Sequence, residues 1–218
     1  MRLPSRFLLV LGLLIASALA QAPAAKPKAA PNANPQGCGR LTDNVLKCPR
    51  FGFTYKVAFG WVDRTDDMQP DDDDDKQESG EAAKLEAGET AKSETLLAVF
   101  ERPPGAPGHS INSAVVIAAE SLSNYHGIKT AADYFGPITE LAEQDRFKVV
   151  NEPHEFLVGT KQLVRGDFSK ERGKLTMWQS SLVMIEKGSI VSFTFVGGSE
   201  DEVEELIGSL TFGLRSPR

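Results

Sequence analysis

The sequence is poor in cysteine, histidine and cationic residues, and each shortage excludes a class of protein. Its 218 residues include two cysteines and three histidines. Two cysteines cannot build a four-thiolate zinc site or a scaffold held by several disulfides. Lysine and arginine number 24 against 30 aspartates and glutamates, so the formal net charge is −6. General nucleic-acid binding depends on lysine and arginine side chains that neutralise phosphates. Because the chain is acidic, we expect no nucleic-acid partner.

Motifs of catalysis are also missing. No G-x-S-x-G nucleophile elbow occurs. His154 and Glu155 are not followed by the second histidine that a zinc-protease helix needs. His109, His126 and His154 stand far apart in the chain and are interpreted as separate surface residues. We therefore predict that the protein is not an enzyme and that it has no catalytic residue, no cofactor and no resident metal.

The first twenty residues have the layout of a cleaved secretory signal peptide. Arg2 and Arg6 form a basic start, residues 7–15 are an apolar run broken by one glycine, and residues 18–20 read Ala-Leu-Ala. The run is shorter than the ~20 residues that a spanning helix needs, so a membrane anchor is the less favoured interpretation. We predict a periplasmic or secreted protein with no membrane span after cleavage.

The predicted export of the protein affects the interpretation of its two cysteines. Cys38 and Cys48 are ten positions apart. In an oxidising compartment, a lone nearby pair most simply forms a structural disulfide. A redox-active pair is the alternative, but such pairs usually have two intervening residues at the start of a helix. We predict a disulfide between Cys38 and Cys48.

Composition divides the rest of the chain into a linker, one domain and an insert. Residues 21–37 are rich in alanine and proline and contain no larger apolar residue, so they are predicted to be a flexible linker. Residues 38–213 are predicted to form a single domain. Residues 66–93 interrupt it with a dense acidic stretch, and like charges of this density favour a disordered insert. Residues 66–89 hold eleven acids and two lysines, so the remainder of the chain after signal cleavage is near neutral.

The centre of the insert is a candidate cation or partner site. It consists of Asp71, Asp72, Asp73, Asp74 and Asp75. Carboxylate oxygens suit Ca²⁺, but an EF-hand that began at Asp71 would need glycine and glutamate where Lys76 and Ala82 stand. Attraction of a basic partner is a second hypothesis. A solvated loop that aids solubility is the third, and the sequence leaves all three open.

Two further features of the sequence are possible ligand sites. Arg165-Gly166-Asp167 spells an adhesion tripeptide, but it lies inside a predicted strand rather than on a loop tip, so we interpret it as coincidental. Trp61 and Trp178 could form an aromatic platform. Buried packing is the favoured role, since Trp178 stands among alternating strand residues.

Hydrophobic periodicity predicts an α+β domain with a mostly antiparallel central sheet of about seven strands, flanked by helices. A middle helix is expected after Thr130, where Pro137 marks either its true start or a kink. A closing helix is expected after Ser199, whose capping box Glu202 completes. The expected strands are residues 51–58, 95–100, 112–121, 147–150, 156–158, 160–168, 174–186 and 189–196.

The order of these segments resembles the Mog1/PsbP-like superfamily and its small exported bacterial members. The segments that carry the resemblance are residues 51–61, 130–135, 157–168 and 189–212. The resemblance implies a central antiparallel sheet sandwiched by helices, an α/β/α arrangement. It also implies that members serve mostly as binding or assembly factors rather than enzymes.

The function expected from these features is that of an exported, non-enzymatic binding or assembly module. Its partner would be a protein or small ligand of the cell envelope, which the sequence does not identify. Two alternatives stay open. One is an enzyme whose site is assembled from distant residues, and the other is a weak cation-binding protein that uses the acidic insert.

Overall fold

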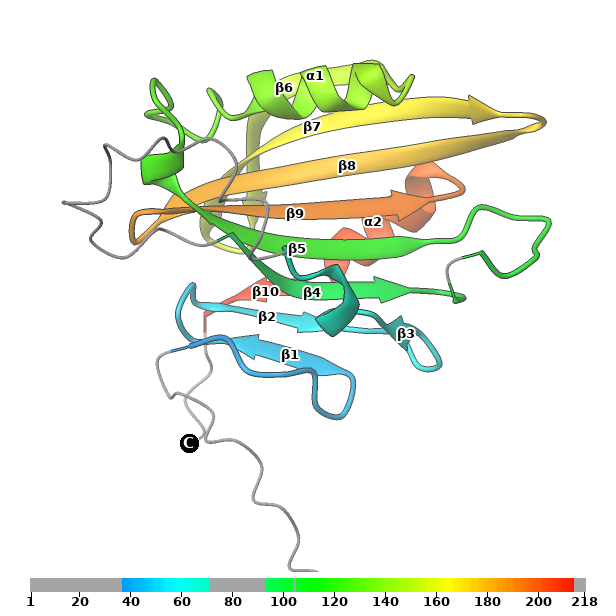
Figure 1. The fold of residues 1–218 in the computed structure, drawn as a ribbon, viewed down its shortest axis with the longest axis horizontal. Coiled ribbons are helices and arrows are strands. Elements are labelled where there is room, and N and C mark those ends of the chain that lie inside the picture. Colours follow the sequence, from blue (N-terminus) through cyan, green and yellow to red (C-terminus); the bar gives the residue numbers. More distant parts are fainter. Residues whose placement is uncertain (1–36, 71–92, 104, 214–218) are drawn as a thin grey trace, which may run out of the picture. The chain divides into compact units, whose positions relative to one another are not determined.

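Antiparallel pairing organises the part of the chain that the computed structural model describes, residues 37–70, 93–103 and 105–213. These residues belong to one compact unit. The elements, of which Figure 1 labels the strands and α-helices, are β1 (Val45–Cys48), β2 (Phe53–Lys56), β3 (Val62–Asp63), the 3-10 helix η1 (Asp66–Met68), β4 (Glu94–Phe100), β5 (Ala114–Ser121), the 3-10 helix η3 (Leu122–Asn124), α1 (Phe135–Gln144), β6 (Lys148–Val158), β7 (Lys161–Arg172), β8 (Leu175–Glu186), β9 (Ser189–Gly197), α2 (Glu200–Gly208) and β10 (Leu210–Phe212).

Two sheets form from these strands. The larger has seven strands in the order β3-β4-β5-β9-β8-β7-β6, and the smaller has the order β1-β2-β10. Every pairing is antiparallel. The chain's last strand, β10, pairs with β2 rather than with its sequence neighbour β9. The predicted α+β class with a mostly antiparallel sheet is therefore confirmed.

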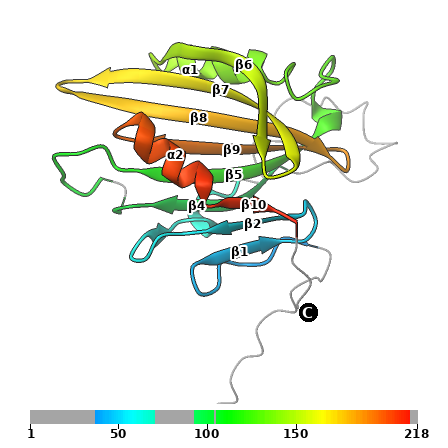
Figure 2. The same ribbon diagram turned by 180° about the vertical axis from the view of Figure 1, so that it is seen from behind.

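The two faces of the large sheet carry separate apolar clusters. Successive strand residues point to opposite faces, and Leu182 and Val183 of β8 accordingly belong to different clusters. The first cluster contains Phe53 of the small sheet and Val203 of α2, whereas the second contains Phe135 of α1. Figure 2 shows α2 crossing the large sheet beside β10.

The predicted α/β/α sandwich is not confirmed in that form. Each face of the large sheet has one short helix, ten residues in α1 and nine in α2. Much of the α2 side is instead covered by β2 and its partners, whose aromatic residues pack onto β9. No helix in the described ranges is long and apolar enough to cross a membrane.

Capping residues fix where the helices begin. Asp133 accepts hydrogen bonds from the backbone N–H groups of Lys129 and Thr130, at 2.9 and 2.8 Å, in a turn that leads into α1. These two hydrogen bonds are the main reason why the pKa of the exposed Asp133 carboxyl is lowered. Pro137 stands in the first turn of α1, where its missing N–H costs no helical bond.

The capping box of α2 forms as the sequence predicts. The Ser199 side chain accepts from the backbone N–H of Glu202 at 3.2 Å. The Glu202 carboxylate in turn accepts from the backbone N–H of Gly198 at 2.7 Å. It also accepts a hydrogen bond from the Ser113 hydroxyl, so the cap joins α2 to the start of β5.

Three expectations about element boundaries need correction. The sequence did not predict β1, because four residues give too little periodicity to detect. The strands expected at 147–150 and 156–158 are parts of one strand, β6, which shifts register twice along its pairing with β7. Residues 66–70 of the predicted insert 66–93 are ordered. Gln69 bonds the backbone N–H and C=O of Thr95 through its side-chain amide, as a neighbouring strand would.

One glycine lets α1 lie close against β7. A Cβ added to Gly166 would lie 2.6 Å from Cε1 of Phe135, a fully buried ring. We expect Gly166→Ala to lower the free energy of unfolding by roughly 1–3 kcal/mol, because the ring must shift in a packed core. Chemical denaturation would measure this change. Gly136→Ala on α1 is the control, since its added Cβ meets nothing within 4 Å, and it should leave stability unchanged or raise it.

Candidate functional site

The structure tests the predicted site residues unequally. Cys38 and Cys48 are joined by a disulfide, and Cys48 is fully buried in the first apolar cluster. The disulfide therefore ties the chain before β1 to the core. Residues 71–75, which hold the aspartate run proposed as a cation or partner site, lie outside the described residues.

The three histidines do not converge. His109 precedes β5 and His126 follows it, so an eight-residue strand of about 26 Å separates them. His154 lies on β6, the opposite edge strand of the sheet from β3. Its Nδ1 is 2.9 Å from the carbonyl oxygen of Glu152. Among the described residues, no three His, Cys, Asp or Glu side chains are grouped so that they could hold a metal ion.

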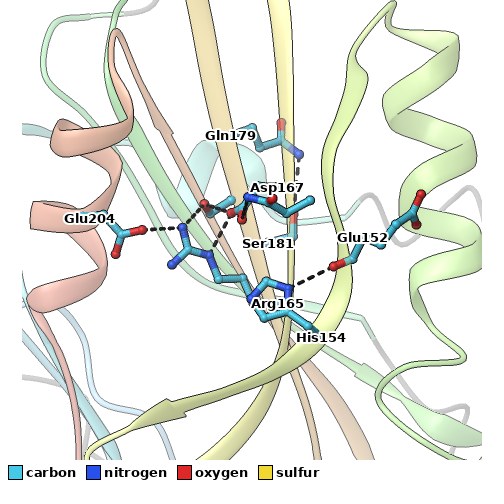
Figure 3. Close-up of polar contacts among 9 residues, drawn as sticks. Glu152, His154, Arg165, Asp167, Gln179, Ser181 and Glu204 are labelled. Atoms are coloured by element: carbon cyan, nitrogen blue, oxygen red, sulfur yellow. Dashed lines mark hydrogen bonds and ion pairs between the residues drawn. The ribbon is translucent and has the colours of Figure 1, made fainter.

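A buried ion pair forms instead at the tripeptide that the sequence offered as an adhesion motif. Arg165 and Asp167 are two positions apart on β7 and therefore share a face of the sheet. Nε of Arg165 donates to Oδ1 of Asp167 at 2.8 Å. The side chains are only 11% and 10% exposed. The two residues thus bond each other rather than present themselves to a receptor (Figure 3).

Asp167 is held as an ionised acceptor. The Ser180 hydroxyl of β8 donates to its Oδ1, and the Asn151 amide of β6 donates to its Oδ2 at 3.0 Å. Burial alone would raise the pKa of this carboxyl. The hydrogen bonds from Ser180, Arg165 and Asn151 outweigh that effect, so the pKa is lowered. Its donors come from three neighbouring strands, and Asp167 therefore fastens the edge strand β6 to the sheet.

Arg165 extends the same network to α2. Its Nη2 donates to Oε1 of Glu204 at 2.5 Å and to the Ser180 hydroxyl at 3.2 Å. Its guanidinium carbon lies 4.9 Å from the centre of the Phe156 ring, a distance at which cation–π attraction operates. Burial opposes the charge of Arg165, but Glu204 and Asp167 outweigh that effect and raise its pKa.

A cavity of about 160 Å³ opens beside this network, between β6, β8 and α2. Its wall has an apolar part, formed by Val150, Trp178 and Val203. Three further carboxylates line it from α2, those of Glu200, Asp201 and Glu204. The cavity thus combines one aromatic wall with a net negative rim.

The two tryptophans are placed differently with respect to this cavity. Both are partly buried against the first apolar cluster, in agreement with the packing role that the sequence favours. Trp178 also lines the cavity, whereas Trp61 does not line it. The two residues therefore do not form a common platform there.

Sequence reasoning missed this site, although one signal was present. An arginine and an aspartate two positions apart in a strand must share a face, and two charges on a buried face need each other as partners. Asn151 and Ser180 carried no comparable signal. They reach Asp167 only because β6 and β8 flank β7 in the sheet.

The fold and the site define an α+β protein with a large antiparallel sheet, a second small sheet and a cavity at a buried ion network.

No family model and no curated protein matches the chain. Among solved structures, it is similar to cyanobacterial PsbP from Synechocystis, with 11% identity and a TM-score of 0.43 over 85% of this chain and 98% of that one. It is also similar to LpqN of Mycobacterium tuberculosis, described as involved in cell envelope biogenesis, with 12% identity and a TM-score of 0.34 over 74% of this chain and 83% of that one. A Pseudomonas aeruginosa protein of unknown function has 14% identity and a TM-score of 0.33 over 56% of this chain and 77% of that one. A PsbP protein is therefore among the solved structures to which the chain is similar, and the similarity is one of fold alone.

Proposed function

We propose that this chain is an exported, non-enzymatic binding or assembly module whose contact site is the cavity beside Arg165 and Asp167. The observation that carries the proposal is the cavity itself, built by three elements that the ion network holds together. Fixed walls of this kind lower the entropic cost of ordering a site when a partner binds.

The protonation behaviour of the network supports binding rather than acid–base chemistry. A general acid or base works best when its pKa lies near the operating pH. The pKa of Asp167 is shifted downward, away from that range. Its carboxylate also accepts hydrogen bonds from three side chains, which occupy it as a structural acceptor.

The cavity's chemistry indicates the kind of group that it would accept. Trp178 and Val150 offer apolar contact, and the α2 carboxylates offer negative charge. A partner that inserts a side chain with an apolar stem and a cationic end would match both features. This is the chemistry of a lysine or arginine presented by an envelope protein.

Blocking the cavity tests the proposal. Val150 lines the cavity and is 41% exposed, and Leu157 on the same strand is 65% exposed but does not line it. We expect Val150→Lys to reduce capture of the partner from an envelope extract at least tenfold, because a long cation would fill the cavity and compete with the guest. Leu157→Lys is the matched control and should capture normally.

Two outcomes would contradict the proposal. One is equal capture by both variants while their melting temperatures match that of the wild type. The other is turnover of any substrate by the purified protein in a broad hydrolase panel, which would remove the non-enzymatic part.

A further inference from the structure

A second cavity, of about 340 Å³, lies where three turns and the end of β10 meet. Its walls are residues 49–52 between β1 and β2, Thr160 and Lys161 at the start of β7, Glu186 and Lys187 at the end of β8, and Phe212 and Gly213. It shares no lining residue with the cavity beside Arg165 and Asp167. Its role is therefore a separate question from the function proposed above.

This second cavity is cationic, although the chain as a whole is acidic. Arg50, Lys161 and Lys187 line it, and Glu186 is its one acidic lining residue. The three cations come from three different places in the chain, since Arg50 and Lys187 stand in two turns and Lys161 is the first residue of β7. A negatively charged group inside the cavity would therefore meet positive charge from several directions, which strengthens its attraction over that of a single surface lysine.

The cations keep hydrogen-bond donors available. Lys161 Nζ lies 2.7 Å from Glu186, and this bond uses one of the three N–H groups of a lysine. Lys187 makes no ion pair or hydrogen bond to another residue in the described ranges. Arg50 is steadied by Glu94 at 3.2 Å, by Ser189 at 3.4 Å and by the Phe51 ring 4.6 Å beneath it. Its five donors are not all used by these partners.

We propose that this second cavity binds a phosphate group. A phosphate monoester carries a charge of about −1.5 to −2 near neutral pH and three strong acceptor oxygens, so it can engage three separate cations at once. A carboxylate has one charge and two oxygens, so it offers the three cations less negative charge and one acceptor oxygen fewer. The phosphate could belong to a soluble monoester or to the headgroup of phosphatidic acid, because both present the same three terminal oxygens.

The test compares two lysines at opposite ends of one strand. Lys187 and Lys174 each stand beside a glycine in a hairpin turn, and twelve residues of β8, about 40 Å, separate the turns. Lys187→Glu removes a cation of the cavity, and Lys174→Glu makes the same charge change elsewhere. Binding of phenyl phosphate would be followed by NMR through the amide signals of Gly52, Thr160 and Gly188. Binding to phosphatidylcholine vesicles that contain phosphatidic acid, against pure phosphatidylcholine vesicles, would be followed by co-sedimentation.

The proposal expects saturable binding to phenyl phosphate, to the vesicles that contain phosphatidic acid, or to both. Lys187→Glu should weaken that binding at least tenfold, and Lys174→Glu less than twofold. Binding to phenyl phosphate would assign a soluble ester, and binding to the vesicles alone would assign a lipid headgroup. Absence of binding to both probes, or an equal loss in the two variants, would overturn the proposal.

Discussion

Replacing Phe193 with alanine is expected to lower the free energy of unfolding by roughly 4 kcal/mol, within the 3–5 kcal/mol typical of buried phenylalanine truncations. The ring is fully buried on β9, the strand at the centre of the large sheet. It makes an edge contact with Phe53 at 5.1 Å and with Phe212 at 6.1 Å, both from the small sheet. Truncation therefore removes packing between the two sheets and leaves a cavity.

Urea denaturation followed by tryptophan fluorescence would measure the loss. Phe59→Ala is the matched control, because that ring is 94% exposed in the turn between β2 and β3. Its removal should change stability by no more than about 0.5 kcal/mol. Equal effects of the two substitutions would show that Phe193 does not join the sheets as described.

The second large effect is expected from Asp167→Ala, at roughly 3 kcal/mol, because removing one partner of a buried ion pair leaves the other charge without full compensation. Arg165 would lose its bond at 2.8 Å, and Asn151 would lose its acceptor. Glu204 still contacts Arg165, which keeps the expected loss at the lower end of the range measured for buried pairs. Glu204→Ala, with its more exposed side chain, should cost less.

The same network predicts a pH dependence of definite sign. The pKa of Asp167 is lower in the folded protein than its ordinary value of 3.8. A carboxyl of this kind contributes stability that is fully present above its unfolded pKa and is lost as the pH falls through its folded pKa. Asp167→Asn removes the titration. We expect the stability difference between wild type and Asp167→Asn to be constant from pH 7 to about 5, and to shrink below about pH 4.

Chemical denaturation at a series of pH values would measure this difference. Asp133→Asn is an informative comparison, since Asp133 also has a lowered pKa but is exposed at the start of α1. Its contribution is screened by solvent, so its effect should be smaller at every pH and should weaken with added salt. A stability difference for Asp167→Asn that grows as the pH falls below 4 would contradict the ionised state assigned to Asp167.

Local patterns in the sequence were enough to predict the elements that depend on neighbouring residues. The alternation of Phe51, Phe53 and Tyr55 predicted a half-buried strand, and all three residues are buried. The Ser199 cap and the apolar spacing of Val203 and Ile207 predicted α2 with its buried stripe. These predictions succeed because a cap and a periodic face are satisfied within a few residues of one another.

Elements that depend on distant partners could not be read in the same way. β1 has four residues, and it is a strand because it pairs with β2, where Leu46 lies opposite Tyr55. β6 contains Pro153 and has mostly exposed side chains, so its sequence has little strand character of its own. It forms an edge strand because it pairs with β7 along its length, before and after the two register shifts.

The sequence by itself determined the fold class, the capped closing helix, the cysteine pairing and the scarcity of catalytic motifs. Tertiary structure alone decided the sites. In the sequence, Arg165 and Asp167 are interpreted as part of a coincidental tripeptide. In the folded protein they form an ion network, because β6, β8 and α2 place Asn151, Ser180 and Glu204 in contact with them. The three cations of the second cavity lie up to 137 positions apart in the chain. Strand periodicity is local and visible in one stretch of chain, whereas such clusters depend on the order of strands in the sheet, which no local pattern specifies.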